Sequence, residues 1–160
     1  MAVLIEKDWC AFGHKFQDRA GHGVDGSHLT EERSPIFIQF LSTLYQIMVQ
    51  FPNSFEYNET ILIFLADHSH SCLFGNFLGN SMKERNQVLK VKEKTKSIWE
   101  FVLINKSKFL NNQYEYNSMP IWPSTSMKNI QIWVRYFTRW DPLMHPNKTC
   151  NLSSEWIDYW

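Results

Sequence analysis

Apolar residues along the chain recur three and four positions apart, the spacing that places side chains on one face of an α-helix. The clearest such segment follows Ser34-Pro35 and ends at Pro52. Serine is a common helix N-cap, and proline is tolerated at the first helical position, so the segment predicts a core helix that begins at Pro35. Its apolar face is formed by Ile36, Phe37, Phe40, Leu41, Leu44, Ile47 and Met48.

The first twenty residues predict another helix, which ends near Gly21 and Gly23. Its apolar stripe consists of Ile5, Trp9, Phe12 and Phe16. Asn58 is expected to cap a helix that runs to the break at 74–75. Ser81 and Glu84 have the capping-box spacing that starts a short charged helix.

Two more helices complete the predicted order. Thr95 is expected to cap a helix around Ile98 and Trp99, and a last helix is predicted over 126–140, ended by Asp141-Pro142. Segments 20–33 and 111–125 have the composition of loops, and strand signals are scarce. The pattern predicts a mostly α-helical fold in one unit of packed helices.

Composition narrows the classes of function. Sixteen Lys and Arg residues balance sixteen Asp and Glu residues, so bulk charge predicts no nucleic-acid partner. No apolar run reaches the roughly 18 residues of a transmembrane helix, and the first residues lack the pattern of a signal peptide. The three cysteines form an odd set without paired spacing, which favours a reducing compartment and a cytoplasmic location.

His68, His70 and Cys72 are the first candidates for chemistry, because imidazole and thiolate groups bind metal ions. Helical spacing places His68 and Cys72 on one face and His70 on another. We therefore expect His68 and Cys72 to face the core and His70 to face solvent, with no metal site and no cofactor.

Cysteine-based phosphoryl transfer is the second candidate. This mechanism needs a thiolate in a loop of backbone N–H groups and an arginine six residues later that binds phosphate oxygens. The residues six positions after Cys10, Cys72 and Cys150 are Phe16, Leu78 and Trp156. All three cysteines are therefore interpreted as structural, and no catalytic residue is assigned.

Lys15 and Arg19 are the third candidate, because residues four apart are neighbours on a helix. Two cations on one face can bind a phosphate group between them. The alternative is a solvated helix face that Asp18 partly neutralises. The residues alone favour the solvated face.

The chain resembles the myotubularin phosphatases over about residues 3–142. The resemblance is carried by motifs that follow one another in the order and spacing of that family. They include Leu4-Ile-Glu-Lys-Asp-Trp9, Phe12-Gly-His-Lys-Phe16, Arg33-Ser-Pro-Ile-Phe37, Ser71-Cys-Leu-Phe-Gly75 and Trp133-Val-Arg-Tyr-Phe-Thr-Arg-Trp140.

The resemblance implies a function at membrane lipids. Myotubularins remove the 3-phosphate from phosphatidylinositol 3-phosphate and 3,5-bisphosphate through a metal-independent cysteinyl phosphate, and some relatives are inactive. Their catalytic His-Cys-Ser-Asp-Gly-Trp-Asp-Arg loop lies upstream of the stretch that matches Ile5-Glu-Lys-Asp-Trp9. Residues 1–142 are thus expected to be the helical C-terminal portion of an α/β cysteine-phosphatase domain, with 143–160 a divergent tail, and the chain alone is expected to be inactive.

The family resemblance also changes the interpretation of the two cations. It implies that Lys15 and Arg19 project toward the inositol headgroup, which favours the phosphate-binding alternative in the intact domain. The expected partners are phosphoinositide headgroups at a cytoplasmic membrane surface, with oligomers formed through regions absent from this sequence. A noncatalytic pseudophosphatase that binds partners or lipids, and a helical bundle unrelated to lipids, are the alternatives.

Overall fold

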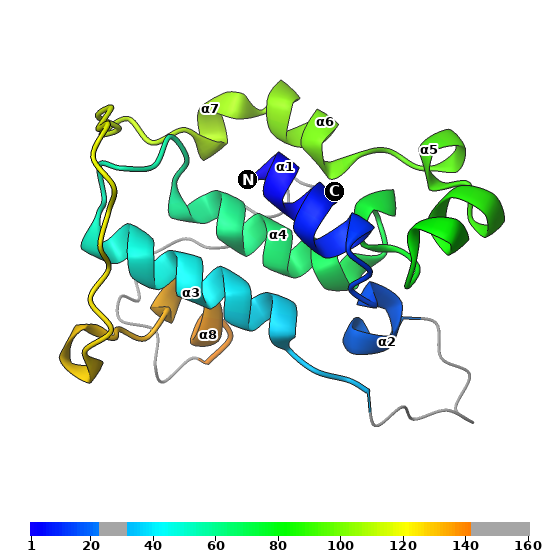
Figure 1. Ribbon diagram of the computed structural model, residues 1–160, viewed down its shortest axis with the longest axis horizontal. Helices are drawn as coiled ribbons and strands as arrows, with labels where there is room; N and C mark the ends of the chain where they lie inside the picture. The colour runs from blue at the N-terminus through cyan, green and yellow to red at the C-terminus, as the bar shows by residue number, and fades with distance from the viewer. Residues whose placement is uncertain (23–31, 142–160) are drawn as a thin grey trace. The chain divides into compact units, whose positions relative to one another are not determined.

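The computed structural model describes residues 1–22 and 32–141, and their regular secondary structure is helical (Figure 1). Pairing between extended segments is confined, within the described residues, to an isolated bridge between Tyr57 and Leu110. The prediction of a mostly α fold is confirmed. The chain divides into two compact units, Met1–Ser124 and Thr125–Trp160, which are described separately.

Helix α4 (Glu59–Ser71) is the core of the first unit. Every residue from Ile61 to Ala66 is buried, which explains why its sequence lacks a polar face. The predicted cap is confirmed, because Asn58 Oδ1 accepts a hydrogen bond from Thr60 N at 2.9 Å. The helix ends at Ser71, before the predicted break, because Cys72 adopts a left-handed conformation with φ 59°.

Helix α3 (Ile36–Gln50) packs beside α4 (Figure 1). Its buried residues are Phe37, Ile38 and Leu41. Pro35 occupies the N-cap position and makes no side-chain capping bond, so the predicted Ser34 cap is wrong by one residue. The helix ends before Pro52, as predicted.

The N-terminal segment is broken where one helix was predicted. It consists of α1 (Ala2–Leu4), the π-helix η1 (Ile5–Ala11) and α2 (Phe16–Ala20). Gly13 separates η1 from α2 with φ 97°, a conformation that suits glycine. The wider π-helical turn and this break remove Phe12 from the predicted apolar stripe, and its side chain is 87% exposed.

Five short helices follow α4 in the first unit. They are η2 (Gly75–Phe77), η3 (Glu84–Val88), α5 (Val91–Lys94), α6 (Ile98–Ile104) and α7 (Lys106–Phe109). Half of the predicted capping box forms, because Ser81 Oγ accepts from Glu84 N at 3.2 Å while Glu84 Oε2 accepts from Asn80 N at 2.7 Å.

The predicted Thr95 cap of the next helix is wrong. Ser97 caps α6, since its Oγ accepts from Trp99 N at 3.3 Å. Thr95 Oγ1 instead donates back to Val91 O at 2.5 Å and closes α5. The 111–125 segment lacks helix, as predicted, and Asn111 anchors its start by donating from Nδ2 to Pro52 O at 2.7 Å.

The second unit corrects the predicted helix over 126–140. Within residues 125–141 it contains η4 (Met127–Asn129) and α8 (Val134–Phe137), with Ile130 in an extended conformation between them. Branched side chains such as Ile130 lose rotamer freedom in a helix, which favours the extended form. Trp133 is buried and its ring lies 4.7 Å from that of Tyr136. The 143–160 tail lies outside the described residues.

Candidate functional site

Lys15 and Arg19 lie one helical turn apart on α2. Lys15 is the N-cap of α2 and its carbonyl accepts a hydrogen bond from Arg19 N at 2.9 Å. The break at Gly13 therefore moves Lys15 to the start of a helix without separating it from Arg19. Lys15 is exposed and Arg19 is partly buried.

Both cations contact Glu32, Lys15 through the side-chain carboxylate and Arg19 through the backbone carbonyl. Lys15 Nζ lies 3.2 Å from Glu32 Oε2, and Arg19 Nη1 donates to the Glu32 backbone carbonyl at 2.8 Å. Asp18 Oδ2 lies 3.7 Å from Lys15 Nζ, as expected for partial neutralisation. The two side chains thus converge on oxygen ligands, the arrangement that a bound oxyanion requires.

Aromatic packing fixes the start of α2. Phe16 is 2% exposed, and its ring centroid lies 5.1 Å from those of both Phe37 and Phe77. The Trp9 ring is 6.4 Å away. Because Phe16 directly follows Lys15, this cluster holds the backbone from which the first cation projects.

His14 directly precedes Lys15 and packs within the aromatic cluster at the start of α2. Its ring contacts Trp9 and Phe16 edge-on, at centroid distances of 4.8 Å and 4.6 Å. Burial lowers the pKa of His14, and the charges of Arg19 and Arg85 lower it further. The imidazole is therefore neutral at physiological pH.

Arg85 is a buried cation that the sequence pattern did not reveal. Its side chain donates to the backbone carbonyls of Leu78, Cys10 and Gly79 at 2.6, 3.0 and 3.2 Å, and the residue is 3% exposed. The pattern placed it in a charged helix, where arginine is usually solvated. Its guanidinium joins the end of η1 to the connection that precedes η3.

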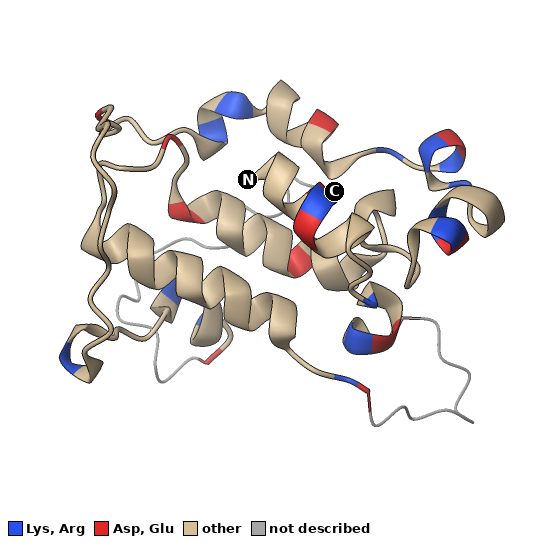
Figure 2. Ribbon diagram, in the orientation of Figure 1, with Lys and Arg blue, Asp and Glu red and all other residues tan. Residues whose placement is uncertain are grey.

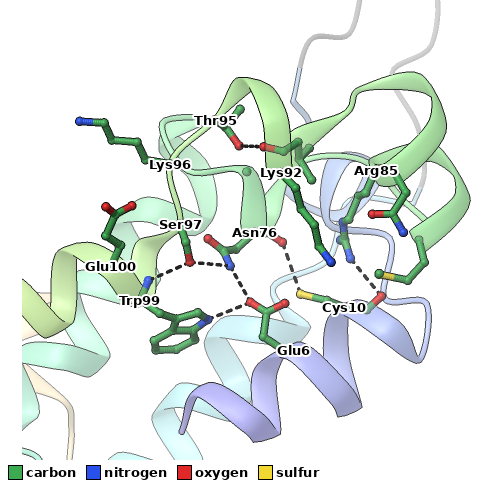
Figure 3. Close-up of a pocket in the computed structure, with 14 residues that line it drawn as sticks. Glu6, Cys10, Asn76, Arg85, Lys92, Thr95, Lys96, Ser97, Trp99 and Glu100 are labelled. Atoms are coloured by element: carbon green, nitrogen blue, oxygen red, sulfur yellow. Dashed lines mark hydrogen bonds between the residues drawn. The ribbon is translucent and has the colours of Figure 1, made fainter.

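A cleft of about 350 Å³ lies between η1, η2, η3 and the start of α6 (Figure 3). Glu6 Oε1 accepts hydrogen bonds there from Trp99 Nε1 at 2.8 Å and from Asn76 Nδ2 at 2.5 Å. Cys10 and Arg85 also line this cleft, so it brings a thiol and a guanidinium together.

Cys10 and Arg85 nevertheless lack the properties of a nucleophile and a phosphate clamp. Burial raises the pKa of Cys10 to about 11, although Arg85 lowers it, so the thiol is protonated at neutral pH. Cys10 Sγ donates to Asn76 O at 3.3 Å. The Arg85 guanidinium is already bound to carbonyls. This geometry supports the interpretation of Cys10 as a structural residue.

The histidine and cysteine motif at the end of α4 is partly as predicted. His68 is buried, with Phe64 and Phe74 centroids 4.4 and 4.9 Å away, and His70 is exposed. Cys72 is exposed rather than buried, because the helix ends at Ser71. No cluster of His, Cys, Asp and Glu in the described part of the chain could hold a metal ion. Cys150 lies outside the described residues.

No helix within 1–22 and 32–141 is long and apolar enough to cross a membrane.

Comparison with known proteins gives a consistent result. The family model of the myotubularin-like phosphatase domain matches residues 1–86. The chain is 43% identical over 147 residues to mouse phosphatidylinositol-3,5-bisphosphate 3-phosphatase MTMR2, covering 91% of this chain and 23% of that protein. It is 45% identical over 150 residues to rat phosphatidylinositol-3,5-bisphosphate 3-phosphatase MTMR6, covering 92% and 22%. It is 46% identical over 142 residues to Xenopus tropicalis myotubularin, covering 88% and 23%. The chain thus spans about a quarter of the length of these relatives.

Proposed function

Because the chain belongs to the myotubularin-like phosphatase domain family, we propose that it forms part of a domain that removes the 3-phosphate from phosphatidylinositol 3-phosphate or 3,5-bisphosphate. The names of two relatives with 43% and 45% identity, which state this reaction for the bisphosphate, support the proposal. Residues 1–142 form the family portion and 143–160 a divergent tail. The protein acts at the cytoplasmic surface of membranes, without a metal or cofactor, and oligomers form through regions outside this sequence.

Lys15 and Arg19 bind phosphate oxygens of the headgroup in this proposal. The single observation that carries it is their convergence on the oxygens of Glu32. Arginine can donate two parallel hydrogen bonds to a phosphate, and lysine adds a point charge. A doubly charged phosphate attracts Lys15 more strongly than one carboxylate does, so it displaces Glu32 Oε2.

The proposed contribution of these residues is binding and support rather than nucleophilic attack. No cysteine of the sequence has an arginine six positions later, and the Cys10 thiol is protonated at neutral pH. We therefore propose that the 160-residue chain alone does not release phosphate. The second candidate function, a noncatalytic lipid-binding protein, uses the same cation pair without turnover.

Phosphate release and headgroup binding test the proposal separately. We expect no phosphate release from phosphatidylinositol 3-phosphate by this chain, and release by a version extended upstream to include a Cys-x-x-x-x-x-Arg loop. Phosphate release by the 160-residue chain would contradict its proposed role in binding and support. Binding without turnover by the extended protein favours the noncatalytic alternative.

The cation pair is tested in the extended protein by titration with inositol 1,3-bisphosphate. Lys15→Ala with Arg19→Ala is expected to weaken binding by about 10- to 100-fold, since two charge-assisted contacts are lost. The control is Lys7→Ala with Lys106→Ala, two exposed lysines elsewhere, which should leave the affinity unchanged. An unchanged affinity in the first variant would contradict the phosphate-binding role and favour the alternative, in which Lys15 and Arg19 lie on a solvated helix face.

A further inference from the structure

Segment 83–96 concentrates positive charge in a chain whose total charge is zero. It contains six basic and two acidic residues. Arg85 is buried, but the other five cations are exposed lysines. We call them the lysine patch: Lys83, Lys90, Lys92, Lys94 and Lys96.

Two acidic residues, Glu84 and Glu93, lie within the segment, but neither forms an ion pair with a lysine of the patch in the described part of the chain. None of its five ammonium groups forms an ion pair within the described residues, whereas Lys15 pairs with both Asp18 and Glu32. Glu84 is the nearest acidic residue in sequence to Lys83, and its Oε2 accepts from Asn80 N. The exposed charge of the patch is therefore available to an external anion.

Backbone geometry gathers the lysine patch at one end of the first unit. Lys90 adopts a left-handed conformation with φ 50°, which turns the chain between η3 and α5, and these two helices contact each other. Asn80 links η3 to α2, because its backbone N donates to Glu84 and its side chain binds Asp18. Figure 2 shows the basic part of α5 at the same end of this unit as the basic part of α2.

We propose that the lysine patch docks the protein on an anionic lipid bilayer, beside the Lys15–Arg19 site. The inference rests on the proposed function, which places the substrate in such a bilayer. Clustered lysines near a membrane surface attract anionic lipids through the surface potential, without recognising one headgroup. Val88, 68% exposed between Lys83 and Lys90, adds an apolar side chain that can enter the interface.

The composition of the segment favours a bilayer over a nucleic acid. Single-stranded nucleic acids are bound by aromatic side chains that stack on bases, together with arginine. Segment 83–96 contains no aromatic residue, and its single arginine is buried among backbone carbonyls. A field of flexible, solvated ammonium groups suits a surface of mobile anionic headgroups.

Vesicle co-sedimentation of the 160-residue chain tests the proposal. Vesicles of phosphatidylcholine alone are compared with vesicles that also contain phosphatidylserine, which carries no inositol phosphate. We expect the chain to bind the phosphatidylserine vesicles, to release as salt rises, and to bind pure phosphatidylcholine much more weakly. Equal binding to both kinds of vesicle overturns the proposal.

A matched pair of variants separates the patch from net charge. The first variant should lower the partition coefficient for phosphatidylserine vesicles by at least about 50-fold. It combines Lys90→Gln, Lys92→Gln, Lys94→Gln and Lys96→Gln. The control combines Lys7→Gln, Lys106→Gln, Lys108→Gln and Lys128→Gln, four exposed lysines elsewhere, and should lower it by less than about 5-fold. Equal losses of vesicle binding in the two variants would contradict the proposed role of the lysine patch. Stronger binding to single-stranded RNA than to phosphatidylserine vesicles would contradict it too.

The proposed function can fail independently of this inference. Lys15→Ala with Arg19→Ala should remove any preference for phosphatidylinositol 3-phosphate over phosphatidylserine vesicles. Retained preference contradicts the headgroup site and leaves the lysine patch intact.

Discussion

Asp18 and Asn80 bind each other through two hydrogen bonds. Asn80 Oδ1 accepts from the backbone N of Asp18 at 3.1 Å, while Asn80 Nδ2 donates to Asp18 Oδ1 at 3.0 Å. One residue thus satisfies a free N–H group in the first turn of α2 and orients the carboxylate that lies nearest to Lys15 in sequence. The helix that carries both cations is fastened to the connection before η3.

Asn80→Ala is expected to lower the free energy of unfolding by about 1–3 kcal/mol, because an N–H and a carboxylate lose their partner. Hydrogen exchange in Phe16–Ala20 should rise with it. Asn86→Ala, an exposed asparagine of η3, is the control and should change stability by less than about 0.5 kcal/mol. Equal effects of the two substitutions in urea denaturation would contradict a specific role for Asn80.

Arg85→Met is expected to destabilise the protein by about 3 kcal/mol or more. The substitution removes the donors of three carbonyl groups, two of whose hydrogen bonds to Arg85 are buried. Arg85→Lys should give an intermediate loss, since one ammonium cannot match the fork of a guanidinium. Urea denaturation measures both against Lys83→Met, an exposed neighbour. A loss below about 1 kcal/mol in Arg85→Met would show that water replaces the guanidinium.

The cysteines are expected to differ in reactivity. In a Cys150→Ser background, the exposed Cys72 should react with iodoacetamide in the native protein, and Cys10 at least about 100-fold more slowly. The thiolate is the reactive form, and burial raises the pKa of Cys10 to about 11. Mass spectrometry of modified peptides gives both rates across pH. A Cys10 rate that levels off below pH 8 would instead identify an activated nucleophile beside Arg85.

Acidification is expected to destabilise the protein through its buried histidines. Burial lowers the pKa of His68 below the ordinary value near 6.5, and the Asp67 charge only partly opposes this. At a given acidic pH the unfolded chain therefore binds more protons than the folded chain. The free energy of unfolding then falls as the pH drops below about 6.5. The largest slope for one histidine is about 1.4 kcal/mol per pH unit.

His68→Phe should flatten this pH dependence, because the aromatic ring keeps the contacts with Phe64 and Phe74 and no longer titrates. Midpoints of urea unfolding between about pH 7.5 and pH 5.5 provide the comparison. An identical slope in the parent and His68→Phe would assign the effect to other groups.

Local signals in the sequence were sufficient for the two long helices of the first unit. Pro52 marked the end of α3 and the cap at Asn58 marked the start of α4, while periodic apolar positions identified α3 as a core helix. The same signals failed for 126–140, where periodic spacing predicted one long helix and the structure forms only the short helices η4 and α8. Spacing describes where side chains fall if a helix forms, but branched residues such as Ile130 oppose its formation.

The candidate site was predictable only in part. The four-residue spacing of Lys15 and Arg19 anticipated one turn of separation, even though Gly13 breaks the helix. Their contacts with Glu32 depend on how the chain returns toward α2, which a local pattern cannot encode. Arg85 was missed for a similar reason, since the carbonyls that bind it include Cys10 O, 75 positions away in the sequence.

In the proposed headgroup site, the buried ring of Phe16 couples ligand binding to folding, because Phe16 directly follows Lys15. Any substitution that loosens Trp9, Phe37 or Phe77 frees the residue next to Lys15, although none of those rings carries charge. Loss of ligand affinity and loss of heat resistance would then arise together from a single apolar change. Genetic variants in this aromatic cluster should thus imitate binding-site lesions while leaving every ionic side chain in place.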